Sequence, residues 1–385
     1  MNEDLQSYSY EQANLINAFR TIMSKMTYLI RFYVVESITG LGNPEATYNE
    51  ILMLPLEKSQ LVITIPGFTG DFPQVALAYL AEMRILIDGM VSGDQAKADE
   101  SIRRLYELSD ETAKILAELS PYWEEEKWRD LLYRYNRCLV AEIIAVKEGD
   151  FNQALNIFET LMGIALTAGD YYAEGFIHFF PEDQPQIPIA YFNMIKDLRS
   201  IGTERAYLTR FYMVARVVEL FDDMDVTRRF FVLMPRLKEK FELIMGTEDA
   251  VELLTLLSMY VIRLEGLIDA ILSGDQAQID TQVREVDEYT GRIASFLSSI
   301  NPYWDETKWK EHFDRSAKLI IEQSYNFQRK EYVEAMKNFE KFLYASLEID
   351  DYFAYGLYQY TKLPSSMSPL SNRSERYKIN FSFGL

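Results

Sequence analysis

The chain carries one aromatic motif twice, as Pro121-Tyr122-Trp123-Glu124-Glu125-Glu126-Lys127-Trp128 and as Pro302-Tyr303-Trp304-Asp305-Glu306-Thr307-Lys308-Trp309. The two copies lie 181 positions apart and contain all four tryptophans of the protein. The match continues at the same spacing from Ser92-Gly93-Asp94 (Ser273-Gly274-Asp275) to Asp170-Tyr171 (Asp351-Tyr352). Upstream, Arg31-Phe32-Tyr33 returns as Arg210-Phe211-Tyr212 at a spacing of 179. The repetition predicts a tandem duplication with a small length change between the halves.

Composition limits the classes of partner. Among 385 residues, 59 are acidic and 39 basic, so the net charge is −20. No stripe of Lys and Arg suited to a phosphate backbone is present, which argues against nucleic acid and anionic membranes as partners. Aromatic residues make up 14% of the chain, whereas only 17 Gly and 12 Pro interrupt it. Long uninterrupted elements are therefore expected, in halves that are each large enough to bury a core.

The remaining bulk features predict a protein made in the cytoplasm. Cys138 is the only cysteine, so no disulfide can form within the chain, and its apolar surroundings predict a buried, inert thiol. The N-terminal residues lack the basic and apolar blocks of a signal peptide. No apolar run is long enough for a membrane span. The final location stays open, and an assembly associated with the cell or the spore is one possibility.

The apolar spacing is helical over most of the chain. Gly-Asp and Ser-Pro pairs separate the helices, because the first residue ends one helix and the second starts the next. Such tight turns make neighbouring helices antiparallel. The first half is expected to form helices over residues 11–39, 71–92, 94–119, 123–148 and 151–176, with a short helix over 46–54. Residues 60–70 fit either a strand or a helix.

The predicted fold is all-α, with two tandem homologous up-and-down helical bundles of the ferritin-like or four-helix type. Each bundle is expected to have about four long helices plus short ones. The domain prediction is an N-terminal arm (1–10), the first bundle (11–180), a Pro-rich linker (181–190), the second bundle (191–361) and a C-terminal arm (362–385).

The C-terminal arm alternates large apolar and polar residues. Tyr377, Ile379, Phe381 and Phe383 recur at every second position, which is typical of a β-strand. An all-helical bundle has no sheet to accept such a strand. We therefore expect the arm to be held either by the body of its own chain or by a neighbouring subunit, and the leading functional hypothesis takes the second.

The segment from Leu86 to Pro181 resembles a group of functionally uncharacterised helical proteins from spore-forming Firmicutes. The resemblance rests on Gly93-Asp94, Ser120-Pro121-Tyr122-Trp123, Trp128-Arg129-Asp130-Leu131-Leu132-Tyr133 and Ala168-Gly169-Asp170. It covers about a hundred residues in each half. The names acetylglutamate kinase and glycosyltransferase, attached to some members, find no support here, because the chain lacks a Gly-rich phosphate loop and a βαβ pattern.

The resemblance implies a bundle interior with His and Glu on the inner faces, as in carboxylate-bridged metal proteins. At the two expected His positions this chain has Tyr79 and Tyr135, with Tyr260 and Ser316 in the second half. Glu142 matches the expected acid, but its counterpart is Gln323. Any metal site would be lost or degenerate, and we predict neither a bound metal nor a cofactor.

Direct inspection of the residues gives no catalytic constellation. The two histidines, His178 and His312, occupy non-equivalent places in the halves, so a paired metal site is not expected. Asp170 and Asp351 sit at matching places in apolar and aromatic surroundings, where a structural role is favoured over catalysis. Arg31 and Arg210 are the expected partners of these two acids.

The four tryptophans, Trp123, Trp128, Trp304 and Trp309, open helices behind a proline. This placement predicts that they wedge the turn between helices, with an interface or ligand-stacking role as the alternative. A possible ligand pocket is expected near Tyr79, Tyr135, Glu142 and Asp170, with Asp351 at the matching place in the second half.

The leading functional hypothesis is a non-enzymatic, self-assembling structural protein whose terminal arms contact neighbouring subunits. It rests on the absence of catalytic motifs, the aromatic content and the two arms. The alternative is a ligand- or metal-binding bundle with a degenerate ferritin-like site. A third reading, an enzyme of an unrecognised type, would require perturbed acids around a pocket.

Overall fold

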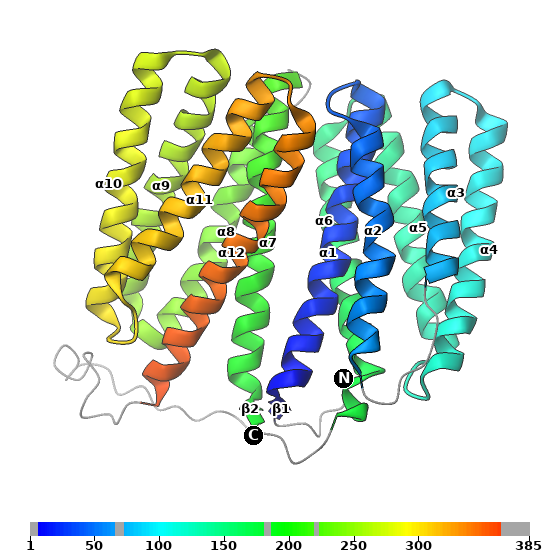
Figure 1. The fold of residues 1–385 in the computed structure, drawn as a ribbon, viewed down its shortest axis with the longest axis horizontal. Helices are drawn as coiled ribbons and strands as arrows, with labels where there is room; N and C mark the ends of the chain where they lie inside the picture. Colours follow the sequence, from blue (N-terminus) through cyan, green and yellow to red (C-terminus); the bar gives the residue numbers. More distant parts are fainter. Residues whose placement is uncertain (1–6, 66–72, 181–185, 219–222, 363–385) are drawn as a thin grey trace. The chain divides into compact units, whose positions relative to one another are not determined.

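The computed structural model describes residues 7–65, 73–180, 186–218 and 223–362, and it confirms the all-α helical bundle (Figure 1). Contacts between residues divide the chain into two units, the first extending to Phe192 and the second beginning at Asn193. This division lies just after the predicted linker, 181–190. The predicted strand with Tyr377, Ile379, Phe381 and Phe383 lies outside the described residues.

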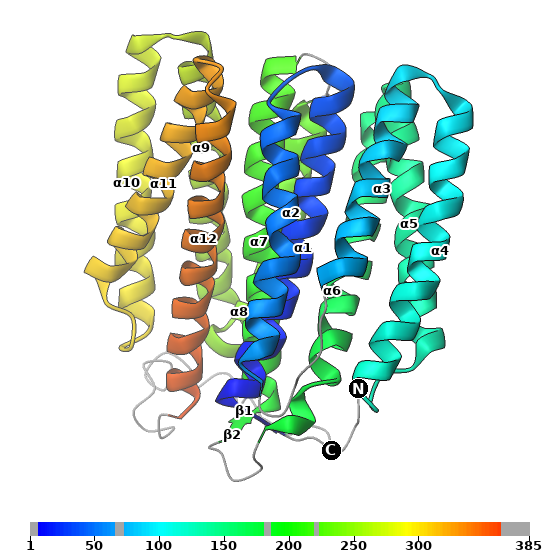
Figure 2. The ribbon, with the colours of Figure 1, turned by 45° about the vertical axis from the view of Figure 1, so that its right-hand side comes forward.

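The first unit contains six α-helices in its described part. Each helix packs against the next one in the sequence, and α6 packs against α1. Figure 2 shows α3, α4 and α5 side by side. The bounds are Tyr10–Thr39 (α1), Pro44–Ile63 (α2), Pro73–Ser92 (α3), Gln95–Leu119 (α4), Glu125–Glu148 (α5) and Phe151–Glu174 (α6), followed by a 3₁₀ turn at Ile177–Phe179.

The second unit repeats this plan. Ion pairs join α7 to α8 and to α12, while α9 packs on α10 and α11, and α11 packs on α12. The bounds are Ile189–Val218 (α7), Asp223–Met245 (α8), Thr247–Ser273 (α9), Gln276–Ile300 (α10), Glu306–Gln328 (α11) and Tyr332–Thr361 (α12). Each described unit therefore has six helices of similar length, and not four long helices with short ones.

The Gly-Asp turns form as predicted. Gly93 adopts a left-handed φ of 76°, which a glycine reaches without steric cost. The Asp94 carboxylate then accepts a hydrogen bond from the backbone N–H of Lys97 at 3.1 Å and caps α4. Gly149 and Asp150 repeat this arrangement between α5 and α6. These turns account for the antiparallel order of the helices.

The prediction of a short helix over 46–54 is wrong in its length. Helix α2 continues through Pro55 to Ile63, so residues 60–63 are helical, and residues 66–70 lie outside the described part. A proline inside a helix removes one backbone hydrogen bond. Here the Ser59 hydroxyl donates to the Pro55 carbonyl at 3.0 Å, and Pro55 itself is buried.

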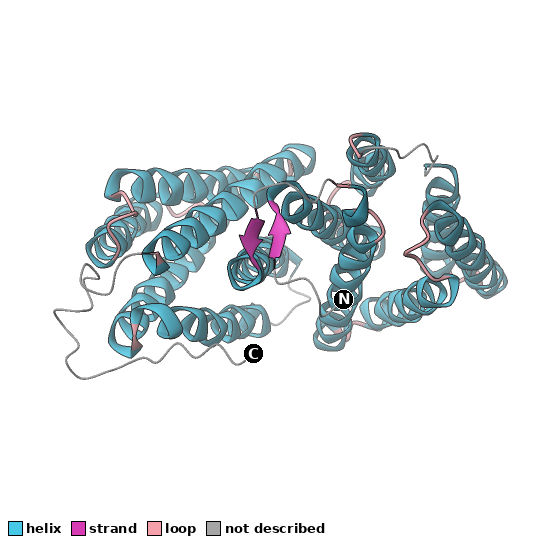
Figure 3. Cartoon of the chain, turned by 90° about the horizontal axis from the view of Figure 1, so that it is seen from below, coloured by secondary structure: helices cyan, strands magenta, loops and turns pink. Residues whose placement is uncertain are grey.

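The N-terminal arm predicted over 1–10 could be held by its own chain or by a neighbouring subunit, and for residues 7–9 the partner is the chain itself. Ser7–Ser9 form a strand, β1, that pairs antiparallel with β2 (Gln186–Pro188), and both strands are visible from below in Figure 3. Ser9 and Gln12 form a capping box at the start of α1. Tyr8 is buried, with its ring 4.8 Å from that of Phe192. Residues 7–9 are thus held by their own chain.

Candidate functional site

The predicted wedge role of the tryptophans matches the geometry in the first unit. The Trp123 indole N–H donates to the Tyr171 carbonyl at 2.7 Å, and the Tyr171 hydroxyl accepts from the backbone N–H of Glu124 at 2.6 Å. The indole lies directly on the backbone of α6, because a Cβ on Gly175 would come within 2.1 Å of its ring. Trp128 is buried against the rings of Tyr171 and Tyr172.

The second unit makes matching contacts. The Trp304 indole N–H donates to the Tyr352 carbonyl at 3.4 Å, and Asp305 N–H donates to the Tyr352 hydroxyl at 2.8 Å. A Cβ on Gly356 would meet the Trp304 indole at 1.8 Å. All four indoles, including that of Trp309, are at most 4% exposed, so a ligand could not stack on them without displacing core side chains.

Three of the residues predicted to line a pocket in the first unit are instead bonded to neighbouring side chains. The Tyr79 hydroxyl donates to the side-chain oxygen of Asn136 at 2.5 Å. The Tyr135 hydroxyl donates to the Thr27 hydroxyl at 3.2 Å, and burial raises the pKa of Tyr135. Glu142 forms an ion pair with Arg31, and both side chains are only 1% exposed. Burial raises the pKa of Glu142, while the charge of Arg31 opposes that rise.

The expected pairing of Arg31 with Asp170 is wrong. Asp170 pairs with Arg20 at 2.7 Å, and Asp351 pairs with Arg199 at 2.6 Å. Arg20 precedes Arg31 by three turns of α1, a separation of roughly 16 Å. Asp170 therefore lies far from the Glu142 ion pair, and the structure does not bring the predicted residues into one pocket. Arg210, the expected partner of Asp351, lies over the rings of Phe327 and Phe339.

A cavity of about 50 Å³ lies inside the second unit. Its walls come from α7, α8, α9, α11 and α12, and this volume exceeds what a single water molecule needs. Most of the lining is apolar: Ile201, Phe230, Leu233, Met234, Leu237, Leu257, Val261, Leu264, Ile268, Phe313, Ile320, Phe342 and Ile349. The polar residues of the lining are Arg205, Thr209, Tyr212, Tyr260, Glu265 and Ser316.

Two lining residues, Tyr260 and Ser316, occupy positions at which the family resemblance implied metal-binding histidines. Tyr260 and Ser316 match Tyr79 and Tyr135 of the first unit, where a degenerate metal site was expected. The relevant difference is one of size, because Ser316 has no ring where Tyr135 has one. The serine at this position could be read from the sequence. That it leaves space becomes visible only when the five helices around it are packed together.

Arg205 and Asp350 form the charged edge of this cavity region. An Arg205 nitrogen lies 3.6 Å from one Asp350 oxygen, and the same nitrogen donates to the Ser346 carbonyl at 3.4 Å. Asp350 is buried against Gly202, since a Cβ there would lie 1.5 Å from its other oxygen. Burial raises the pKa of Asp350 to about 7, and the charge of Arg205 opposes that rise. Asp350 and Arg205 were missed at the sequence level, because neither belongs to the repeated motif.

The metal-binding reading gains no support from the geometry. Among the described residues, no group of three or more His, Cys, Asp or Glu side chains is placed to hold a metal ion. His178 stacks on Tyr122 at 4.0 Å between ring centroids, and His312 packs against Trp309 and Tyr352. Cys138 is only partly buried, contrary to expectation, and this burial raises the pKa of its thiol.

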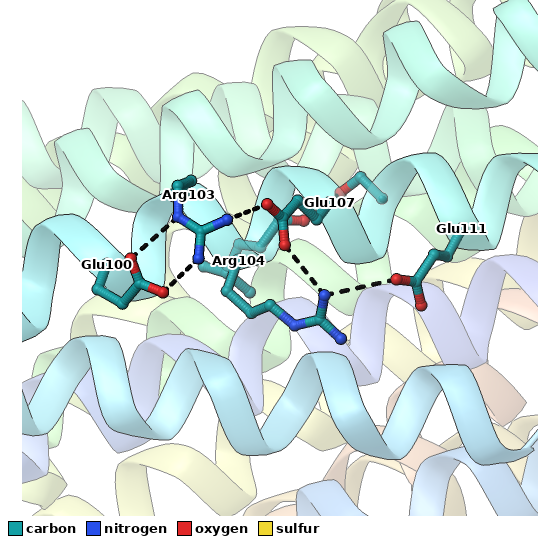
Figure 4. A network of polar contacts seen from close by, with 7 residues as sticks. Glu100, Arg103, Arg104, Glu107 and Glu111 are labelled. Atoms are coloured by element: carbon teal, nitrogen blue, oxygen red, sulfur yellow. Dashed lines mark hydrogen bonds and ion pairs between the residues drawn. The ribbon is translucent and has the colours of Figure 1, made fainter.

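The acidic surface is partly organised in ion-pair networks. On α4, Arg103 bridges Glu100 and Glu107, and Arg104 reaches Glu107 at 3.0 Å and Glu111 at 3.4 Å (Figure 4). All five side chains are more than 40% exposed. Such exposed pairs contribute little to stability. We therefore assign this network no binding role.

None of the described helices has both the length and the apolar character needed to cross a membrane. A scan against protein-family models, a search of the curated proteins and a search of the solved structures found no match to this chain. The resemblance to the Firmicutes group stays a prediction.

Proposed function

We propose that the protein is a non-enzymatic, small-molecule-binding helical bundle whose second unit takes a ligand into the cavity. The observation that carries this proposal is the cavity's apolar wall together with the buried Tyr260 hydroxyl. Tyr260 is 6% exposed, and its hydroxyl faces the Ser316 hydroxyl of the same lining without a hydrogen bond of ordinary length to it. An unsatisfied buried polar group is unfavourable, and a ligand that pairs with it would remove that penalty.

Binding is favoured over catalysis by the residues of the lining. The described lining contains neither histidine nor cysteine, which are frequent acid–base and nucleophilic groups. Burial raises the pKa of Tyr260, so its hydroxyl keeps its proton and acts as a hydrogen-bond donor at neutral pH. Filling an apolar cavity is itself favourable, because the lining atoms gain contacts that they lack when it is empty.

Ser316→Tyr tests the proposal by restoring the ring that the first unit has at the matching position. We expect xenon under pressure to raise the melting temperature of the natural protein and to leave that of Ser316→Tyr unchanged, because one xenon atom fits a cavity of about 50 Å³ and the added ring occupies that space. Ser295→Tyr, on the exposed face of α10, is the matched control and should respond like the natural protein. An equal response of all three proteins would place binding elsewhere and contradict the proposal.

The two units are proposed to descend from a tandem duplication. The ion pair Arg20–Asp170 has a counterpart in Arg199–Asp351, and the matching residues are 179 and 181 positions apart. The tryptophan contacts on Tyr171 and Tyr352 support the same relationship. In this view the second unit gained space for a ligand where Ser316 stands in place of a tyrosine.

Self-assembly is the second candidate function. The alternation of Tyr377, Ile379, Phe381 and Phe383 favours it, since such a strand can add to a sheet edge in another copy. Residues 7–9 of the N-terminal arm contribute no free strand to contacts between subunits, because they already pair with Gln186–Pro188. A change of native mass with protein concentration is the direct test.

A further inference from the structure

One face of α12 carries large exposed side chains in a straight line. Val333, Tyr344 and Tyr355 lie eleven residues apart, which is about three helical turns, so all three are on the same side of the helix. These residues are between 39% and 47% exposed. Helix α12, orange to red in Figure 1, packs on α11 and is joined to α7 by ion pairs. Aromatic residues are enriched in interfaces between proteins, so this line is a candidate contact surface.

The first unit shows that the fold does not require these side chains. The matching residues of α6 are polar or lack a side chain: Asn152, Gly163 and Glu174. The charges of the same face also belong to the second unit alone. Two lysines and a glutamate of α12 stand where α6 has the uncharged residues Asn156, Thr160 and Thr167. The second unit has therefore acquired both the aromatic line and the charges around it.

The charges of this face are arranged about Tyr344. Lys337 precedes it by seven residues, and Asp351 follows it by seven. Lys341 precedes it by three, and Glu348 follows it by four. The half of the face before Tyr344 thus carries two lysines, and the half after it carries two carboxylates. Two such helices that lie antiparallel, with their tyrosines facing each other, bring each lysine near a carboxylate of the other helix.

These charges have partners within the chain and keep capacity for more. The intrachain contacts are Lys337–Glu334, Lys341–Asn338, Glu348–Arg315 and Asp351–Arg199. The side chains of Lys337, Glu348 and Asp351 are nevertheless about half exposed. An ammonium donates three hydrogen bonds and a carboxylate accepts about four, so a second partner needs no intrachain pair to break. Of the other acids near the lysines, Glu334 lies about a quarter turn to the side and Glu340 is partly buried.

We propose that a second copy of this chain binds to this face of α12, with the two helices antiparallel and Tyr344 at the twofold axis. The inference rests on self-assembly, the second candidate function, and names its contact surface. Val333 of each copy then lies beside Tyr355 of the other. Both copies use the same surface, so the contact closes at two copies and does not extend into a filament.

The α12 contact alone is too small to hold two copies together firmly. A stable interface buries about 1,600 Å² in total, and one helix from each copy is not expected to reach that area. The segment after Lys362 follows α12 directly in the sequence and is the expected source of the remaining contact. A chain ending at Lys362 should therefore stay at the mass of one copy at micromolar concentration.

Tyr344→Glu and Tyr344→Lys test the twofold contact in sedimentation velocity experiments on the full chain. Each variant alone places two like charges at the twofold axis, so we expect the dissociation constant of the dimer to rise by at least about a hundredfold. An equimolar mixture of the two variants places Glu against Lys and should restore a dissociation constant within about tenfold of the natural one. A folding defect in either variant would not be repaired by mixing.

Three further variants locate the contact and its charges. Tyr355→Glu carries the residue of the matching position in the first unit and should weaken the dimer by roughly tenfold. Val283→Glu changes a residue of α10 that is 40% exposed, and it should associate like the natural protein. Lys337→Glu should weaken the dimer by roughly tenfold at low salt and by less at high salt. Lys318→Glu, which changes an exposed lysine of α11, is its matched control and should have no effect.

The outcomes separate this surface from self-assembly itself. If Tyr344→Glu dimerises like the natural protein, if mixing restores nothing, or if the mass rises beyond two copies, the α12 assignment is overturned and self-assembly stands. Tighter association of the chain ending at Lys362 would mean that the C-terminal segment covers this face in its own copy, which also overturns the assignment. If the natural chain stays at one copy at every concentration, both proposals fail.

Discussion

Asp350 is a buried carboxyl whose protonation is coupled to folding. Burial raises its pKa from 3.8 to about 7, against the opposing charge of Arg205; Asp351 adds to the rise and Arg199 opposes it. The folded state therefore holds more protons than the unfolded state between these values, so stability falls as the pH rises through this window. We expect Asp350→Asn to remove this dependence and to raise the free energy of unfolding above pH 7 by roughly 4 kcal/mol.

Urea denaturation of both proteins on either side of the window measures this effect. The two proteins should differ little in free energy of unfolding near pH 3.8, the ordinary pKa of the Asp350 carboxyl. The difference should reach its full size above pH 7, where the folded natural protein also loses this proton. Parallel pH profiles for the natural protein and Asp350→Asn would mean that Asp350 does not carry the raised pKa.

Lys58 shows the opposite sign of coupling. Its ammonium group lies 4.3 Å from the centre of the Tyr172 ring, and burial lowers its pKa from 10.5 to about 8. Between these values the unfolded state holds more protons, so this residue's contribution to stability improves as the pH rises. Lys58→Met should therefore stabilise the protein by roughly 3 kcal/mol at neutral pH, with the gain shrinking as the pH approaches 10.5.

Lys238 provides the matched comparison in the second unit, because it occupies the corresponding place on α8 and is partly exposed beside Glu242. Lys238→Met should change stability by less than about 0.5 kcal/mol. Similar gains from the two substitutions would show that added hydrophobicity, and not relief of the buried charge, is the cause.

At the scale of the elements, the turns between the last two helices of each unit differ in one informative residue. Gly149 ends α5 with a φ of 78°, whereas Lys330, at the matching position, has a φ of 61°. This left-handed conformation costs a lysine roughly 1 kcal/mol more than a glycine. We expect Lys330→Gly to stabilise the protein, and Gly149→Lys to destabilise it, each by about that amount in thermal unfolding.

A Cβ on Gly149 would contact no atom within 4 Å, so the effect of Gly149→Lys should be conformational and not steric. Opposite signs for the reciprocal substitutions would support this explanation. Destabilisation by both would mean that contacts of the Lys330 side chain outweigh its backbone strain.

The helices and their turns could be predicted because the signals are local. A glycine followed by a capping aspartate fixes the end of one helix and the start of the next, whatever lies around them. The length of α2 could not be predicted, because Pro55 lacks the N–H that would donate to the Ile51 carbonyl, and only the packing around the buried proline offsets that loss. The strand at Ser7–Ser9 escaped notice for a similar reason, since its partner lies at Gln186–Pro188.

At the scale of the molecule, the features that could not be predicted from the sequence are side-chain contacts between different helices. Glu142 was correctly predicted to lie on an inner helix face. Its partner Arg31 was wrongly paired with Asp170, because the spacing of residues along a helix does not say how far one helix is shifted along its axis relative to its neighbour. The cavity was missed because five helices must meet before a small side chain such as Ser316 leaves space between them. Its charged edge, Arg205 and Asp350, is visible only once α7 and α12 are in contact.

Self-association is the remaining prediction for the whole molecule. Within the described residues the sheet consists of β1 and β2, so each strand has one edge that a strand from another copy could extend. If the segment with Ile379 and Phe381 adds in this way, the full chain should show a native mass above 44.9 kDa that rises with concentration. A chain ending at Lys362, and the variant Ile379→Lys, should both remain at the mass of one copy, while Asn380→Asp should still associate. Association of the shortened chain would rule out this segment, and a single-copy mass for every protein would leave ligand binding as the function to pursue.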